Sequence, residues 1–233
     1  MPRVRQYTQR VIIYGTNEDL GFEILKWILA IDTHDNSEAN ATVIVPEKMS
    51  LSVQEEAVIK DVKARLDSNT KLDAIICVAG RRAGGNLRTG LAGTSEIMWR
   101  HTVHSSVIAS CLAAHFLKEG GFLLLTGSYD ALNASPRNMA HGMAKAAVHH
   151  LIKSLGTEGS GMPKESCCVG ILLSSLDTFL NRLRMPYKHL LKLTPLHFIA
   201  NLYYKWSCNE ERPKNGSLLC LVTENSETSI VPV

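Results

Sequence analysis

Residues 118–162 read KEGGFLLLTGSYDALNASPRNMAHGMAKAAVHHLIKSLGTEGSGM. Within this stretch, the apolar residues 122–126 predict a buried strand, because short aliphatic runs bounded by glycine are typical of parallel sheets. A turn-rich segment follows, and apolar residues at helical spacing then predict a helix over 139–155. A strand, a loop and a helix in this order form the repeating unit of an α/β fold.

The same alternation of strands and helices extends in both directions from this stretch. Further strands are predicted at 11–14, 28–31, 41–45, 72–78, 167–173 and 217–222. Further helices are predicted at 51–66, at 95–118 with Gly120–Gly121 as the C-cap, and at 195–206. We therefore expect residues 1–233 to form a single α/β domain, a Rossmann-like doubly wound parallel sheet with right-handed crossovers. In such a sheet, ligands bind beyond the carboxyl ends of the strands.

Composition and charge exclude several classes of protein. The formal charge is only +3 and the basic residues are scattered, which does not favour a nucleic-acid partner. No apolar run approaches the roughly 20 residues that a membrane span needs, and residues 1–10 lack the apolar core of a signal peptide. The six cysteines show neither zinc-type spacing nor the density of a disulfide scaffold, so we expect reduced thiols in a cytoplasmic protein.

Histidines in the predicted helices raise the question of a metal site. His101 and His104 are three residues apart, and His149 and His150 are adjacent, but no third ligand stands at a recognisable spacing. We expect these side chains on helix surfaces or at an interface, and no metal.

A glycine turn follows the first predicted strand. Gly15 ends the strand 11–14 and Gly21 stands six residues later. A strand followed by glycines and a helix allows backbone N–H groups to hold a pyrophosphate. Taken alone, two glycines after a strand are weak evidence for such a site.

Three longer segments carry a more specific signal. They are LDAIICVAGRRAGGN at 72–86, the stretch 118–162, and Leu176-Asp177-Thr178 with Asn181-Arg182 and Met185-Pro186. With Thr194-Pro195-Leu196 and Gly216-Ser217-Leu218, they resemble the quinoid dihydropteridine reductases of the short-chain dehydrogenase/reductase superfamily over nearly the whole chain. The resemblance implies a homodimeric enzyme that takes hydride from NADH to reduce a pterin-like substrate, quinoid dihydrobiopterin, to tetrahydrobiopterin.

The resemblance also implies the positions of a cofactor site. Gly15 and Gly21 correspond to the pyrophosphate turn, and Asp32 to the acidic residue that binds the adenosine ribose. The other cofactor-binding positions are Ala79, Gly80, Lys145, Leu176 and Thr178, on the nicotinamide side. NADPH is a less favourable cofactor than NADH, because Asp32 would repel its 2′-phosphate.

The implied catalytic positions depart from the pattern of the family. Lys145 matches the lysine of the Tyr-x-x-x-Lys motif, but His141 stands in place of the tyrosine. Ser128 lies thirteen residues before position 141, the spacing of the catalytic serine in the wider superfamily, although dihydropteridine reductases usually have no serine there. Imidazole donates protons near neutral pH, but it is shorter than a phenol, and Lys145 would lower its pKa. His141 would therefore act as a poor acid or through water.

The implied substrate side is formed by Arg82 and Asn181. Arg81-Arg82 stands where the family has Gly-Trp. An arginine can stack on a planar ring and attract an acidic ligand, or both side chains can simply be solvated in a loop. The sequence leaves these alternatives open.

The first βαβ unit departs from the family in two further ways. Glu18 replaces the middle glycine of the turn, which adds bulk and negative charge near a pyrophosphate. Only ten residues separate Gly21 from Asp32, so the first helix is a stub, the second strand is displaced, or the sequence is a splice form. Together with His141, these departures leave a second function open, that of a non-catalytic relative acting as a binding or dimerisation partner.

Overall fold

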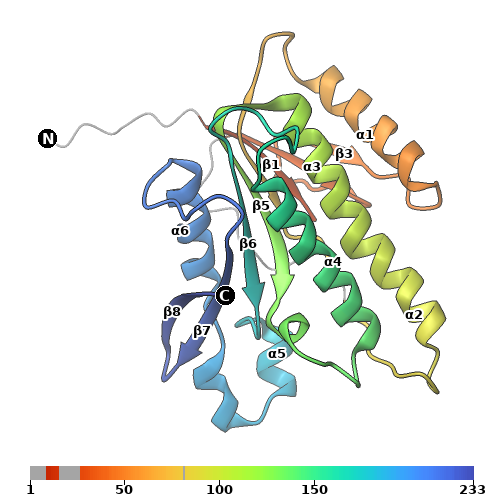
Figure 1. Cartoon of the computed structure of the whole chain (residues 1–233), viewed down its shortest axis with the longest axis vertical. Coiled ribbons are helices and arrows are strands. Elements are labelled where there is room, and N and C mark those ends of the chain that lie inside the picture. Colours follow the sequence, from red (N-terminus) through yellow and green to blue (C-terminus); the bar gives the residue numbers. More distant parts are fainter. Residues whose placement is uncertain (1–8, 16–26, 81) are drawn as a thin grey trace, which may run out of the picture.

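The computed structural model describes residues 9–15, 27–80 and 82–233 (Figure 1). One eight-stranded sheet has the strand order β3-β2-β1-β4-β5-β6-β7-β8, and every pairing is parallel except that of β7 with β8. The strands are β1 Arg10–Tyr14, β2 Trp27–Asp32, β3 Ala41–Ile44, β4 Leu72–Cys77, β5 Leu117–Ser128, β6 Cys167–Leu173, β7 Leu218–Glu224 and β8 Glu227–Pro232. The doubly wound α/β fold predicted from the sequence is confirmed.

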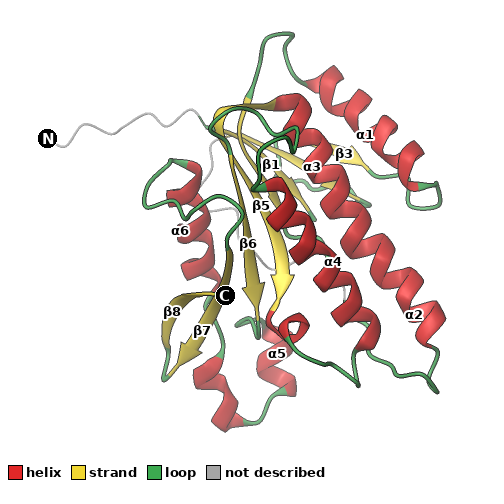
Figure 2. Cartoon of the chain, viewed as in Figure 1, coloured by secondary structure: helices red, strands yellow, loops and turns green. Residues whose placement is uncertain are grey.

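Helices cover both faces of the sheet (Figure 2). The α-helices are α1 Leu51–Arg65, α2 Leu91–Met98, α3 Ser105–Phe116, α4 Met139–Leu155, α5 Phe179–Arg184 and α6 Leu196–Ser207. A π-helical segment, Trp99–His104, joins α2 to α3, and 3₁₀ turns occupy Tyr129–Leu132 and Tyr187–Lys192. No helix in the described ranges is long and apolar enough to cross a membrane.

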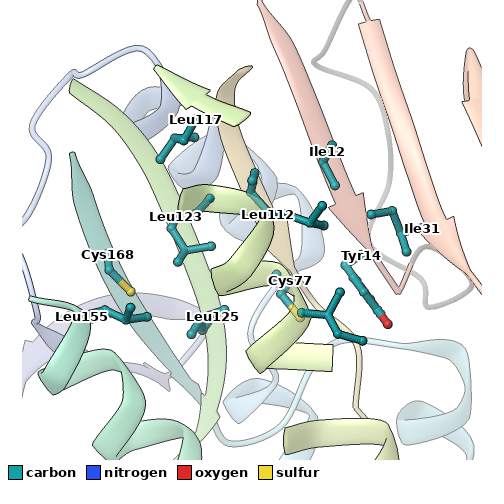
Figure 3. Close-up of a cluster of buried hydrophobic side chains, with 14 of the residues drawn as sticks. Ile12, Tyr14, Ile31, Cys77, Leu112, Leu117, Leu123, Leu125, Leu155 and Cys168 are labelled. Atoms are coloured by element: carbon teal, nitrogen blue, oxygen red, sulfur yellow. The ribbon is translucent and has the colours of Figure 1, made fainter. Parts of the chain in front are cut away.

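The core consists of two apolar layers because successive strand residues point to opposite faces. In β1, Ile12 packs with α1, α3 and α4 on one face, whereas Val11 packs with α6 on the other. Figure 3 shows the first layer, in which Leu112 of α3 lies against side chains of β1, β4 and β5. Aliphatic side chains buried from both faces fix the sheet rigidly, and with it the loops at its carboxyl end.

The second strand is not displaced. β2 pairs with β1 in parallel from Arg10–Trp27 to Tyr14–Ile31, and Asp32 is its last residue. The alternative of a displaced strand is therefore wrong. The predicted short helix, with Gly21 and Glu18, lies outside the described residues.

The helix predicted at 95–118 differs from the structure at both ends. It begins at Leu91, after Gly90 in the left-handed conformation, and it ends at Phe116. Leu117, not Gly120–Gly121, is the C-cap, because β5 already pairs with β4 at Leu117 before the register shifts and resumes at Phe122. Gly120 has φ +67° within this bulge. The left-handed conformation that glycine permits is therefore needed in the strand and not at the end of the helix.

The C-terminal hairpin was not predicted. β7 and β8 are joined by Asn225 and Ser226, both with positive φ, as a two-residue hairpin turn requires. The Asn-Ser pair between two alternating segments was the available signal. This antiparallel strand closes the edge of an otherwise parallel sheet.

Candidate active site

A cavity of about 400 Å³ opens at the carboxyl ends of β1, β2 and β4. Four predicted cofactor residues line it, namely Gly15, Asp32, Ala79 and Gly80. The structure adds nine lining residues that sequence reasoning missed: Tyr14, Thr33, His34, Val45, Glu47, Gln54, Arg100, His101 and Ser105. They come from four separate segments, so no local motif marks them.

Gly15 is required by the close approach of two strand ends. Its φ is +91°, and a Cβ at this position would lie 2.4 Å from the Cα of Ala79. The Tyr14 carbonyl accepts from the backbone N–H groups of Val78 and Ala79, at 2.9 and 3.0 Å. The absence of a side chain at Gly15 therefore lets the ends of β1 and β4 meet and keeps the floor of the cavity open.

Asp32 points its carboxylate to the rim of the cavity at the end of β2. Its Oδ1 accepts from the Thr33 backbone N–H at 2.6 Å and from the Thr33 hydroxyl at 3.3 Å. The Thr33 hydroxyl also lies 2.9 Å from His34 Nδ1. These bonds fix the carboxylate of Asp32 as an anionic hydrogen-bond acceptor at the rim of the cavity.

A row of three α4 side chains covers the end of β5. His141, Lys145 and His149 are spaced four residues apart, so they share one helix face, and each is at most 7% exposed. His141 Nε2 lies 3.2 Å from Ser128 Oγ, and Lys145 Nζ donates to the Thr126 carbonyl at 2.7 Å. The three predicted catalytic positions, Ser128, His141 and Lys145, are thus brought together.

The row adjoins the cavity at Gly80. A Cβ at Gly80 would lie 3.2 Å from Lys145 Nζ and 3.8 Å from Thr102 Oγ1. Thr102 is fully buried in the π-helical segment, and its hydroxyl has no hydrogen-bond partner among the described residues. Sequence reasoning missed Thr102, because the π-helical segment that contains it, a geometry common at functional sites, has no sequence pattern of its own.

His149 is not on the helix surface, as the sequence had suggested, but buried. Its Nε2 accepts the Ser128 backbone N–H at 3.2 Å. Burial, together with the charges of Lys145 and Lys153, lowers the pKa of His149 to about 4. The ring is therefore neutral near pH 7 and carries its proton on Nδ1. His150, the next residue, is exposed as expected.

Arg82 is tied to the loop that follows β5. Its Nη2 lies 2.8 Å from Asp130 Oδ2, in an ion pair whose side chains are 57% and 36% exposed. The Asn138 amide, with its oxygen facing this guanidinium, accepts from the same nitrogen at 3.0 Å. Arg82 is thus anchored beside the 3₁₀ turn after Ser128, while Arg81 lies outside the described residues.

The predicted residues after β6 brace one another. The Thr178 hydroxyl accepts from the Asn181 N–H at 3.2 Å and caps α5, while Asn181 Nδ2 donates to the Leu176 carbonyl at 2.8 Å. A β-bridge joins Leu176 to Thr194. Leu176 and Thr178 do not line the cavity, so the structure separates them from the Gly15–Asp32 end of the site.

No arrangement for a metal ion is present in the ranges that the structure describes. No group of three histidine, cysteine, aspartate or glutamate side chains is placed to hold an ion there. All six cysteines carry free thiols.

Solved structures with the same fold are numerous. A short-chain dehydrogenase family protein from Francisella tularensis subsp. tularensis SCHU S4 superposes with a TM-score of 0.74, at 16% identity over 92% of this chain and 97% of that one. A short-chain dehydrogenase from Burkholderia cenocepacia J2315, solved in complex with NADP, gives 0.73 at 19% identity over 94% and 98%.

Sequence similarity defines the family more narrowly than the fold does. No family model matches the sequence. The dihydropteridine reductase of Dictyostelium discoideum, however, is 32% identical over 95% of this chain and 98% of its own length. A relative this similar over the full length, together with the same sheet topology, shows that the chain belongs to the dihydropteridine reductase family and has the short-chain dehydrogenase/reductase fold.

Proposed function

We propose that this protein is an NADH-dependent reductase that converts quinoid dihydropteridines, such as dihydrobiopterin, to their tetrahydro form. The observation that carries the proposal is the junction at Gly80, where the cavity with Gly15 and Asp32 meets Lys145 and the Ser128–His141 pair. The cofactor half and the proton-donating half of a reductase site are contiguous there. The family relationship supports the same assignment.

The cavity fits a dinucleotide by its construction. Gly15 and Gly80 leave the strand ends uncovered, and Asp32 presents a carboxylate at the end of β2. When bound, the nicotinamide cofactor supplies a hydride. Asp32 accepts hydrogen bonds from the adenosine ribose and disfavours a 2′-phosphate, so NADH is preferred to NADPH.

Ser128 and His141 deliver the proton. The Ser128 hydroxyl transfers its proton to the substrate as the hydride arrives, and the protonated His141, whose Nε2 lies 3.2 Å away, gives its Nε2 proton to Ser128 Oγ and is left as neutral imidazole. Lys145 orients the nicotinamide ribose from its place beside Gly80. This pair takes the role of the missing tyrosine, at a lower rate, because the imidazole reaches less far. Arg82 and Asn181 lie on the proposed substrate side, with Leu176 and Thr178 flanking the nicotinamide.

The test begins with cofactor affinity. We expect calorimetry to give micromolar NADH binding, weaker NADPH binding, and a smaller difference between the two in Asp32→Ala. A reductase assay with NADH and quinoid dihydropteridine should then show turnover that Lys145→Ala abolishes. Absence of NADH binding at millimolar concentration would refute the enzyme assignment.

A second function is favoured by one observation, the histidine at position 141. If NADH binds but no pteridine is reduced, the protein acts as a non-catalytic binding or dimerisation partner. Absence of NADH binding would also leave this second function, so the affinity measurement and the reductase assay on the same preparation together distinguish the two.

The proposed assembly is a homodimer through α2, the π-helical segment and α4. These helices lie side by side (Figure 1), and they expose the apolar side chains Ile97, Trp99 and Met143. The free thiols accord with a reducing compartment, and we place the protein in the cytoplasm.

A further inference from the structure

His149 is a buried titratable residue to which the proposed chemistry gives no role. It belongs to the same α4 row as His141 and Lys145, one helical turn beyond the lysine, and it is 6% exposed. Its ring nitrogen Nε2 accepts the backbone N–H of Ser128 at 3.2 Å. A side chain that binds the backbone of a proposed catalytic residue differs from an ordinary core histidine.

The end of β5 needs this partner because the sheet does not supply one on that side. The last residue of β5 paired with β4 is Leu125, opposite Cys77, whereas pairing with β6 continues to Ser128 opposite Leu173. Ser128 therefore extends three positions beyond its neighbour β4. The imidazole of His149 takes the place of the missing strand as acceptor for the Ser128 N–H.

Gly127 shows that the ring is fitted closely to the strand. A Cβ at Gly127 would lie 2.6 Å from His149 Nε2 and 2.9 Å from its Cδ2. Only a glycine at this position lets the ring lie against the backbone next to Ser128. The contact fixes both the strand end and the ring.

We propose that His149 is a positioning residue, which accepts the Ser128 N–H on Nε2 and thereby holds the Ser128 hydroxyl against His141. The inference rests on the proposed function for its catalytic consequence, but the positioning itself is a property of the free protein. Three side chains of one face of α4 then contact three polar groups at the end of β5. His141 contacts the Ser128 hydroxyl, His149 the Ser128 N–H, and Lys145 the Thr126 carbonyl.

The protonation state of His149 accords with this role. An acceptor at Nε2 requires a neutral ring, and burial with the nearby ammonium groups of Lys145 and Lys153 lowers its pKa to about 4. Burial, with a smaller contribution from the two lysines, thus keeps His149 in the form that accepts the Ser128 N–H.

The experiment compares His149→Leu, which removes the acceptor, with His149→Gln, whose side-chain oxygen replaces Nε2. His150→Leu, at the exposed neighbouring position, is the matched control. We expect His149→Leu to lower kcat about 10- to 100-fold, as a misplaced catalytic group does, with the NADH dissociation constant unchanged. His149→Gln should restore most of kcat, and His150→Leu should leave it unaltered.

A spectroscopic readout separates this proposal from the reductase assignment. In the free protein, the ¹⁵N shift of His141 Nε2 should change in His149→Leu and stay unchanged in His149→Gln and His150→Leu, whether or not pteridine is reduced. Unchanged His141 shifts in a folded His149→Leu variant would overturn the positioning role, as would equal losses of kcat in the leucine and glutamine variants.

Wild-type protein provides a measurement that does not depend on any variant folding. The ¹⁵N shift of His149 Nε2 at pH 7 should be that of an unprotonated, hydrogen-bonded nitrogen, and the Ser128 amide should exchange slowly with solvent. A protonated Nε2 or a rapidly exchanging Ser128 amide would contradict the proposal.

Discussion

His141, which the family resemblance aligns with a tyrosine, contacts Ser128, which that resemblance does not lead one to expect. The two side chains are both buried, with Nε2 and Oγ 3.2 Å apart. The Ser128 hydroxyl therefore lies within reach of the imidazole of His141. A tyrosine at position 141 is longer, and its phenol would need no such intermediary. The sequence showed each substitution separately, and only the structure shows that they contact each other.

His141→Tyr tests whether the imidazole limits the rate. A phenol extends farther from α4, beside the same Lys145, so we expect kcat to rise about 10-fold or more. Steady-state kinetics with NADH and quinoid dihydropteridine provide the measurement. The double change with Ser128→Ala, the matched control, should keep the gain. No increase in a folded, NADH-binding variant would show that another part of the site is limiting.

Gly15→Ala tests the close contact of β1 and β4. An alanine here would have to adopt a positive φ, and its Cβ would lie 2.4 Å from the Cα of Ala79. We therefore expect the free energy of unfolding to fall by about 3 kcal/mol. NADH affinity should fall as well, because the floor of the cavity must move. Urea denaturation and calorimetry measure the two effects.

The same substitution at Gly93 is the control. Gly93 lies in α2, with no atom within 4 Å of its added Cβ, and its φ is not in the left-handed region. Gly93→Ala should therefore raise the free energy of unfolding by about 0.5 kcal/mol, since alanine is the better helix former. Equal destabilisation at both positions would contradict the steric explanation.

Among the elements, α4 couples the site to stability through its buried face. His149 is neutral in the folded protein because its pKa is lowered from 6.5 to about 4. In the unfolded chain the ring is solvated and takes up a proton near pH 6.5. Between these two values the unfolded state binds more protons, so acid favours unfolding.

We therefore expect the free energy of unfolding to fall as the pH is lowered from about 6.5 toward about 4, and to be insensitive to His149 above that window. Urea denaturation at several pH values across this range measures the effect. The free energy of unfolding should depend less on pH in His149→Gln than in the wild type. Some dependence should remain in the variant, because burial and Arg100 also lower the pKa of His104. A variant with an unchanged pH profile would show that His149 titrates alike in both states.

The elements that the sequence predicted correctly are those with strong apolar patterns. The helix over 139–155 and the strand over 167–173 have the predicted bounds. The helix before β5 was misjudged because tertiary pairing begins at Leu117 and because a π-helical segment has no sequence pattern of its own. Element ends are decided by neighbours that lie far away in sequence.

At the scale of the whole molecule, exposed apolar side chains indicate where a second chain would bind. Ile97 and Trp99 are 45% and 42% exposed, and Met143 of the adjacent α4 is 46% exposed. A single apolar side chain at a surface is ordinary, but three on adjoining helices favour an interface. The proposed homodimer would bury them.

Met143→Glu should convert a dimer of the 25.7 kDa chain into monomers, because it places a charge within the proposed apolar interface. Light scattering or sedimentation gives the mass. The control is Leu183→Glu on α5, which is 67% exposed and lies outside these helices, and it should leave the dimer intact. A monomeric wild type, or equal effects of both variants, would refute this assembly.

The sequence by itself determined the doubly wound sheet, and it singled out the positions Gly15, Asp32, Ala79, Gly80, Ser128, His141 and Lys145 as candidates. Aliphatic runs and helical spacing are local properties, and the family segments are long enough to be specific. Only the tertiary structure decided which of these residues meet: Ser128 with His141 and His149, and Gly80 with Lys145 and Thr102. These contacts join residues 13 to 65 positions apart in the chain, and packing of helices on the sheet, which no local pattern encodes, brings them together.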